Sequence, residues 1–89
     1  DTFDAMRTLD ALRYIDATDY ATWRDVGMAL KSTGHPDARA VWDTWSADSD
    51  KFDAQEQDRQ WEYFSPSAIT VASIFYHAGK AGWQARRAA

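Results

Sequence analysis

Apolar residues recur at helical spacing in the central part of the chain, residues 38–64. One stripe, at positions i, i+3, i+4 and i+7, consists of Ala38, Val41, Trp42 and Trp45. After an Asp/Ser-rich stretch, Trp61 and Phe64 stand three positions apart near the end of a mostly polar run. The pattern predicts two helices whose aromatic rings meet, and we expect them to form the centre of a small helical core.

Two further helices are predicted before this centre. Thr2 is expected to cap the first, with Asp4 in its first turn and the polar turn of residues 16–19 at its end. Its inner stripe comprises Ala5, Leu9, Leu12 and Ile15. The second helix is expected to run from its N-cap, Asp19, to about Thr33, where Gly34 suits the left-handed position after a helix.

Gly27 lies on the apolar face of this second helix. A glycine within a helix costs about 1 kcal/mol relative to alanine, so its presence needs a reason. The favoured interpretation is the close approach of another helix or of a Trp ring, and a hinge is the alternative.

The helices of the central pattern have predictable ends. The third is expected from Pro36, which suits the first helical position, to about Ala47. The fourth is expected from Asp53 to about Tyr63, and Glu56 completes a capping-box pattern with Asp53. The Ser-Pro-Ser sequence at 65–67 stops it.

The fifth helix has the cleanest pattern. Thr70 is its expected cap and Gly82 its expected end, and its stripe comprises Val71, Ile74, Phe75 and Ala78. No strand pattern of useful length occurs. The sequence therefore predicts an all-α fold, a small bundle of five short helices with a tryptophan-rich core, over residues 1–83, with residues 84–89 as a tail or linker.

Composition limits how the chain can be stabilised. The 89 residues include five tryptophans and no cysteine, so packing must supply the stability. The charge is uneven: residues 1–62 hold all 14 acids and seven bases, whereas residues 63–89 hold three bases and no acid. No apolar run approaches the roughly 20 residues of a membrane helix, and we expect no membrane partner and a cytoplasmic location. The start at Asp1 suggests an excised fragment.

A calcium loop is one candidate among the acidic residues. Asp48, Asp50 and Asp53 have suitable spacing, but the sixth position is Asp53 instead of glycine and the twelfth is Arg59 instead of glutamate. Helix capping and turn hydrogen bonds explain these acids better.

Catalytic and metal motifs are not found. His35 and His77 are far apart in the sequence and have no cysteine near them, so zinc spacing is missing. No nucleophile motif and no glycine-rich phosphate loop occurs. We expect a non-catalytic domain with no cofactor of its own.

Basic residues interleaved with aromatic rings are the remaining candidates for function. Cations can contact phosphates and an exposed ring can stack on an unpaired base. The candidate nucleic-acid-binding residues are Lys51, Arg59, Lys80, Trp83, Arg86 and Arg87. The alternative is that Lys51 and Arg59 pair with neighbouring acids and that Trp83 belongs to the core.

Several short motifs, taken in order, resemble those of a known family. They are Leu12-Arg13-Tyr14-Ile15-Asp16, the run from Trp23 to Lys31, Trp42 to Phe52, Trp61 with Phe64, and Ile69 to Phe75 with Ala81-Gly82-Trp83. Together they resemble the second type of primase C-terminal domain, a small helical domain of many phage and plasmid primases. The Ser-Pro-Ser turn departs from the glycine-containing turn expected there.

The resemblance implies a non-catalytic domain of a DNA primase-polymerase. The active site of the parent chain would lie in a neighbouring archaeo-eukaryotic-type primase-polymerase domain, and a hexameric replicative helicase often follows. The implied role is assistance to primer synthesis in DNA replication, through contact with the single-stranded DNA template and the initiating nucleotide. The alternative is a protein-interaction spacer that docks the primase-polymerase domain to the helicase, which the acidic residues 1–62 favour.

Overall fold

The computed structural model describes residues 3–65 and 69–85, which form five helices and no strand. The helices are α1 (Ala5–Leu12), α2 (Tyr20–Lys31), α3 (Ala38–Ser46), α4 (Ala54–Tyr63) and α5 (Val71–Lys80). The predicted all-α class and the five predicted helices are confirmed.

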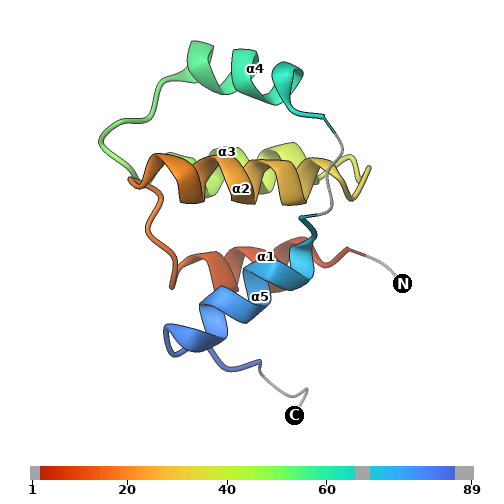
Figure 1. Cartoon of the computed structure of the whole chain (residues 1–89), viewed down its shortest axis with the longest axis vertical. Coiled ribbons are helices and arrows are strands. Elements are labelled where there is room, and N and C mark those ends of the chain that lie inside the picture. Colours follow the sequence, from red (N-terminus) through yellow and green to blue (C-terminus); the bar gives the residue numbers. More distant parts are fainter. Residues whose placement is uncertain (1–2, 66–68, 86–89) are drawn as a thin grey trace.

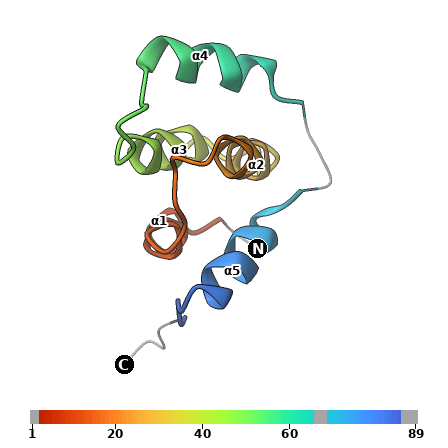
Figure 2. The same ribbon diagram turned by 60° about the vertical axis from the view of Figure 1, so that its left-hand side comes forward.

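The helices are stacked in three layers along the long axis of the molecule (Figure 1). α2 and α3 lie side by side in the middle, α4 lies on one side of them, and α1 and α5 lie on the other, as the turned view of Figure 2 also shows. α1 packs on α3 and α5, and α2 packs on α3, α4 and α5. The molecule extends 40 Å along its longest axis, with α4 at one end and α5 at the other.

Aromatic rings fill the space between the middle layer and α4. The Trp42 side chain is fully buried, and its ring centroid lies 4.8 Å from that of Trp23, 5.4 Å from that of Trp61 and 5.4 Å from that of Phe64. The α3 stripe that the sequence predicted is buried in full. The predicted meeting of the central aromatics is thus confirmed, with Trp42 at its centre.

These rings explain why position 27 in α2 is a glycine. A Cβ added at Gly27 would lie 2.5 Å from Cε2 of Phe64 and 2.8 Å from Cε2 of Trp42, closer than real Cβ atoms come to other atoms. The close approach of a Trp ring is confirmed, and no hinge is needed to explain the glycine.

A second, smaller cluster joins α1 to the end of α5. Trp83 is buried beside Ala11 and Ala78, and its ring lies 5.3 Å from that of Phe75. The backbone turns there at Gly82, whose φ is +112°. The N–H of Trp83 donates to the carbonyl of Ala78 at 2.9 Å, and that of Gly82 donates to Gly79 at 3.1 Å, the pair of bonds that defines a Schellman C-cap.

Two of the predicted caps are confirmed. Asp19 Oδ2 accepts a hydrogen bond from the backbone N–H of Thr22 at 3.0 Å, at the start of α2. Asp53 Oδ1 accepts from the N–H groups of Gln55 and Glu56, at the start of α4. The capping box is only half formed, because the Glu56 carboxylate accepts from Arg59 and Gln60 instead.

The other helix ends differ from the predicted ones. Thr2 lies outside the described residues, and Asp4 caps α1 by accepting from the N–H of Arg7 at 3.0 Å. Ile15 lies beyond the end of α1 and not within it. Thr70 occupies the N-cap position of α5, but its side chain makes no capping hydrogen bond.

The start of α3 is shifted by two residues. Pro36 and Asp37 form a turn, in which the N–H of Asp37 donates to Nδ1 of His35 and the N–H of Ala38 donates to the carbonyl of His35. The helix therefore begins at Ala38, and Pro36 is not its first residue.

Candidate nucleic-acid interface

The predicted nucleic-acid-binding cations that the structure describes, Lys51, Arg59 and Lys80, do not form one surface. Lys51 lies in the connection between α3 and α4, and Arg59 lies on α4. Lys80 is the last residue of α5, at the other end of the molecule. Among the described candidates, Lys51 and Arg59 therefore do not share a face with Lys80, because α4 and α5 are separated by the α2–α3 layer (Figures 1 and 2). That these residues bind nucleic acid stays a prediction.

Two of these cations have local partners. Arg59 forms an ion pair with Glu56 on the same helix, as the alternative interpretation anticipated. Lys51 Nζ donates to the backbone carbonyl of Thr18 at 3.3 Å, so its partner is a carbonyl and not an acid. Both residues are exposed. Lys51 lies near enough to Asp16 and Asp19 to add to the hydrogen bonds that lower their pKa, and Arg59 pairs with Glu56, so a phosphate at either cation would also meet a carboxylate.

Trp83 is a core residue. Its side chain is buried, and its Nε1–H donates to Oδ2 of Asp10 at 3.0 Å. An indole held in this way is not available to stack on a base, so the alternative interpretation of Trp83 is the correct one. Arg86 and Arg87 lie outside the described residues.

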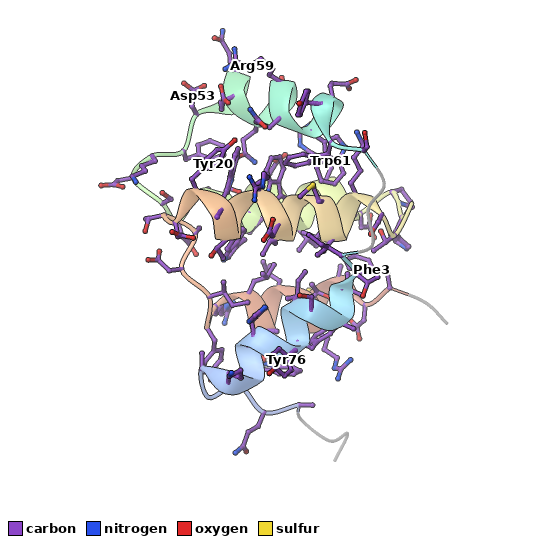
Figure 3. All side chains as sticks on the ribbon, viewed as in Figure 1. Phe3, Tyr20, Asp53, Arg59, Trp61 and Tyr76 are labelled. Carbon is purple, nitrogen blue, oxygen red and sulfur yellow. The ribbon has the colours of Figure 1, made fainter. Side chains whose placement is uncertain are left out.

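An exposed ring beside a cation does occur on α5, at a position that the sequence analysis did not single out. Tyr76 is 61% exposed, and Lys80 Nζ lies 5.4 Å from its ring centroid. Figure 3 shows Tyr76 at the opposite end of the molecule from Arg59. The i, i+4 spacing of Tyr76 and Lys80 on the polar face of the helix was the available signal.

Arg7 adds a second cation to this end of the molecule. It lies on α1, and the carbon of its guanidinium group is 4.5 Å from the ring centroid of Phe75 and 5.4 Å from that of Trp83. The side chain is exposed, so its planar cation is both positioned by the rings and open to solvent.

Charge is distributed unequally between the layers. The described residues of the α1–α5 layer, 3–14 and 69–85, contain three bases and two acids: Arg7, Arg13, Lys80, Asp4 and Asp10. Residues 15–65, which include α2, α3 and α4, contain eleven acids and five bases. Of the described parts of the chain, the α1–α5 layer is therefore the one where an anion meets the least repulsion.

A polar network attaches α4 to the middle layer. Trp23 Nε1 donates to Oε1 of the buried Gln57 at 3.1 Å, and Nε2 of Gln57 donates to Asp43 at 2.7 Å. Arg39 pairs with Asp43 and with Asp58, at 2.9 and 2.6 Å. Partial burial alone would lower the pKa of Arg39, but its hydrogen bonds to the two carboxylates raise it on balance. The Arg39 guanidinium therefore helps to hold α4 against the middle layer.

The connection from α1 to α2 carries two acids with strengthened acidity. Thr18 donates its backbone N–H and its hydroxyl to Asp16, and Thr22 does the same to Asp19. These bonds favour the ionised form and lower the pKa of both carboxyls. Both groups are therefore negatively charged at neutral pH.

The described residues, 3–65 and 69–85, contain no group of three or more His, Cys, Asp or Glu side chains that could hold a metal ion. His35 lies after α2 and stacks near Phe3, and His77 is exposed on α5. Over the same residues no helix is both long and apolar enough to cross a membrane.

Comparison with known proteins places the chain among replication domains. Residues 6–78 match the sequence profile of the family described as Primase C terminal 2. A protein of Invertebrate iridescent virus 3 with the name "Putative helicase 121R" is 38% identical over 60 residues, which are 65% of this chain. The match spans only 6% of that viral protein. No solved structure matches the chain significantly.

Proposed function

The chain belongs to the Primase C terminal 2 family, and from this we propose that it assists primer synthesis by contacting single-stranded DNA template through its α1–α5 layer. The domain itself is non-catalytic and is associated with primase and helicase proteins of DNA replication. In the proposal it holds no cofactor, and the catalytic carboxylates and metals lie in a neighbouring primase-polymerase domain of the parent chain. The domain would work in the cytoplasm, on phage or plasmid templates.

The observation that supports this surface is the pair formed by Tyr76 and Lys80. Exposed aromatic rings next to cations are the usual means by which proteins hold single strands, with the ring under a base and the cation at a phosphate. Arg7 would supply a further cation on the same layer, and Arg86 and Arg87 follow in sequence. Lys51 and Arg59 are left out of the proposed surface because they lie at the acidic end.

Primer initiation is the step that needs such a surface. Two nucleotides on a template have little stacking to offset the translational and rotational freedom that they lose, so a second protein surface lowers the entropic barrier. The proposed contacts to the template, and to the initiating nucleotide bound on it, therefore matter more before the first bond forms than during extension.

A pair of matched charge reversals tests the proposal. Lys80→Glu and Arg59→Glu change the net charge equally, but only the first alters the proposed surface. We expect Lys80→Glu to weaken binding of a fluorescent single-stranded oligonucleotide roughly tenfold at low salt, and Arg59→Glu to have little effect. Equal effects of both, or no binding by the unaltered chain at low salt, would contradict the proposal.

The second candidate function is a spacer that docks the primase-polymerase domain to the replicative helicase. The excess of acids in residues 15–65 favours it, because a domain used only for DNA would carry fewer carboxylates. Under this candidate the chain binds one of those domains without DNA, and Lys80→Glu leaves that binding unchanged.

A further inference from the structure

A groove lies between α2 and α5, closed at one end by the connection from α1 to α2. Its volume is about 480 Å³, within the range of roughly 300–1,000 Å³ typical of ligand-sized clefts. Val26 and Ala29 of α2 and Ile74 of α5 form its apolar floor. α5 packs on α2, on the side of α2 that faces away from α4 (Figures 1 and 2). We call this feature the α2–α5 groove.

The rim of the α2–α5 groove is acidic. Asp16, Asp19 and Asp25 line it, and its described lining residues include no Lys or Arg. Asp16 and Asp19 are exposed. Arg24 forms an ion pair with Asp25 at 3.3 Å from Oδ1, and the Asp25 side chain is 46% exposed. The groove therefore combines an apolar floor with two or three negative charges at its edge.

We propose that the α2–α5 groove is a docking site for a short basic amphipathic segment of a partner protein. Aliphatic side chains of the segment would lie on the floor formed by Val26, Ala29 and Ile74, and its Lys or Arg side chains would pair with the rim carboxylates. Such a segment presents apolar anchors at helical spacing with cations on the flanks, which is the complement of this surface.

Nucleic acid is a poor fit to the same groove. A phosphate placed at the rim would meet Asp16 and Asp19 within the reach of Coulomb repulsion. The cation near these two carboxylates, Lys51, is not a lining residue and donates to the carbonyl of Thr18. The groove and the proposed DNA surface use different residues of α5: Ser73, Ile74 and His77 line the groove, whereas the exposed Tyr76 and Lys80 do not.

Removal of the rim charges without loss of shape tests the docking site. The triple variant Asp16→Asn, Asp19→Asn and Asp25→Asn keeps an oxygen at each position, and Asn is as good an N-cap as Asp, so α2 retains its start. The matched control is Asp37→Asn, Asp48→Asn and Asp50→Asn, three exposed acids outside the groove, with the same change in net charge.

The probe is a labelled synthetic peptide with leucines at i, i+3, i+4 and i+7 and lysines on its flanks, titrated by fluorescence anisotropy. We expect the rim triple to weaken binding about tenfold and the control triple to have little effect at moderate salt. A peptide with glutamates in place of the lysines should not bind. A second variant, Ser73→Lys, puts a cation at the groove edge and should weaken binding as strongly as the rim triple.

Three outcomes would overturn the docking site: equal loss of binding in the rim and control triples, equal binding of the lysine and glutamate peptides, or displacement of the peptide by an oligonucleotide. The unfolding temperature of each variant shows that it is folded. Lys80→Glu should not weaken peptide binding, because it adds no cation near the groove, and the rim triple should not weaken oligonucleotide binding. Failure of this proposal is therefore distinguishable from failure of the proposed DNA surface.

Discussion

The backbone of Gly27 lies against the indole of Trp42, so closely that a Cβ at Gly27 would be 2.8 Å from Cε2 of that ring. The same Cβ would be 2.5 Å from Cε2 of Phe64. Neither ring can withdraw easily, because Trp42 is fully buried and its Nε1–H donates to the carbonyl of Trp23 at 3.2 Å. Because Gly27 has no Cβ, α2 can come this close to α3 and to the end of α4.

Gly27→Ala is expected to destabilise the fold. Alanine favours the helix by about 1 kcal/mol, but overpacking against two buried rings costs about 1–3 kcal/mol. We expect the cost of overpacking to exceed the gain in helix propensity. Thermal unfolding measures the result. Gly79→Ala is the matched control: this glycine is also within a helix but a Cβ there meets nothing within 4 Å, so it should raise stability. A stabilised Gly27→Ala variant would contradict the packing argument.

Gln57→Met should loosen α4. The change keeps the volume and removes the hydrogen bonds that the amide makes with Trp23 and Asp43, at an expected cost of about 1–2 kcal/mol in free energy of unfolding. Gln55→Met, at an exposed position on the same helix, should be neutral. Urea titrations compare the two, and equal stability would mean that the network does not hold the helix.

Acidification should weaken the cap of α2. Thr22 lowers the pKa of Asp19 in the folded state below the value of 3.8 that applies to an unperturbed carboxyl. The stabilisation is therefore complete above about pH 4 and is lost as the pH falls through the lowered value. Asp19→Asn has no carboxylate to protonate, so its unfolding temperature should fall less on acidification than that of the unaltered chain. Asp48→Asn provides the matched loss of one exposed carboxylate, and parallel curves for all three proteins would contradict the assignment.

The salt dependence of DNA binding should identify the contacting layer. If Lys80 contacts a phosphate, Lys80→Ala lowers the slope of log affinity against log salt by about 0.7 for a single strand. Arg59→Ala should leave the slope unchanged, since Arg59 pairs with Glu56 on α4. The same slope for both variants would place the phosphate contacts elsewhere.

Local patterns predicted the fold well because each depends on neighbouring residues. The α3 stripe, the caps at Asp19 and Asp53 and the reason for Gly27 are confirmed. The errors are local as well: the sequence predicts Pro36 as the first helical residue, but the ring nitrogen of His35 stabilises a turn there. Several side chains can compete for one helix end, and spacing alone does not decide between them.

The candidate site was predicted less well, since it depends on how the helices are ordered in space. Arg59 and Lys80 lie on consecutive helices, α4 and α5. Only the stacking of the layers shows that these helices lie at opposite ends of the molecule. The burial of Trp83 depends on the Schellman turn at Gly82 and on Asp10, more than seventy residues earlier. Tyr76 and Lys80 had a readable spacing, but nothing in the sequence showed that this face of α5 is uncovered.

The segregation of charge between the layers makes the domain an electric dipole along its 40 Å axis. In the field of a nearby polyanion such a body experiences a torque, which turns the α1–α5 layer towards the strand and α4 away from it before any contact is made. Under the proposed function, the charge distribution of this acidic domain would therefore act mainly on its orientation as it approaches DNA, and less on net attraction.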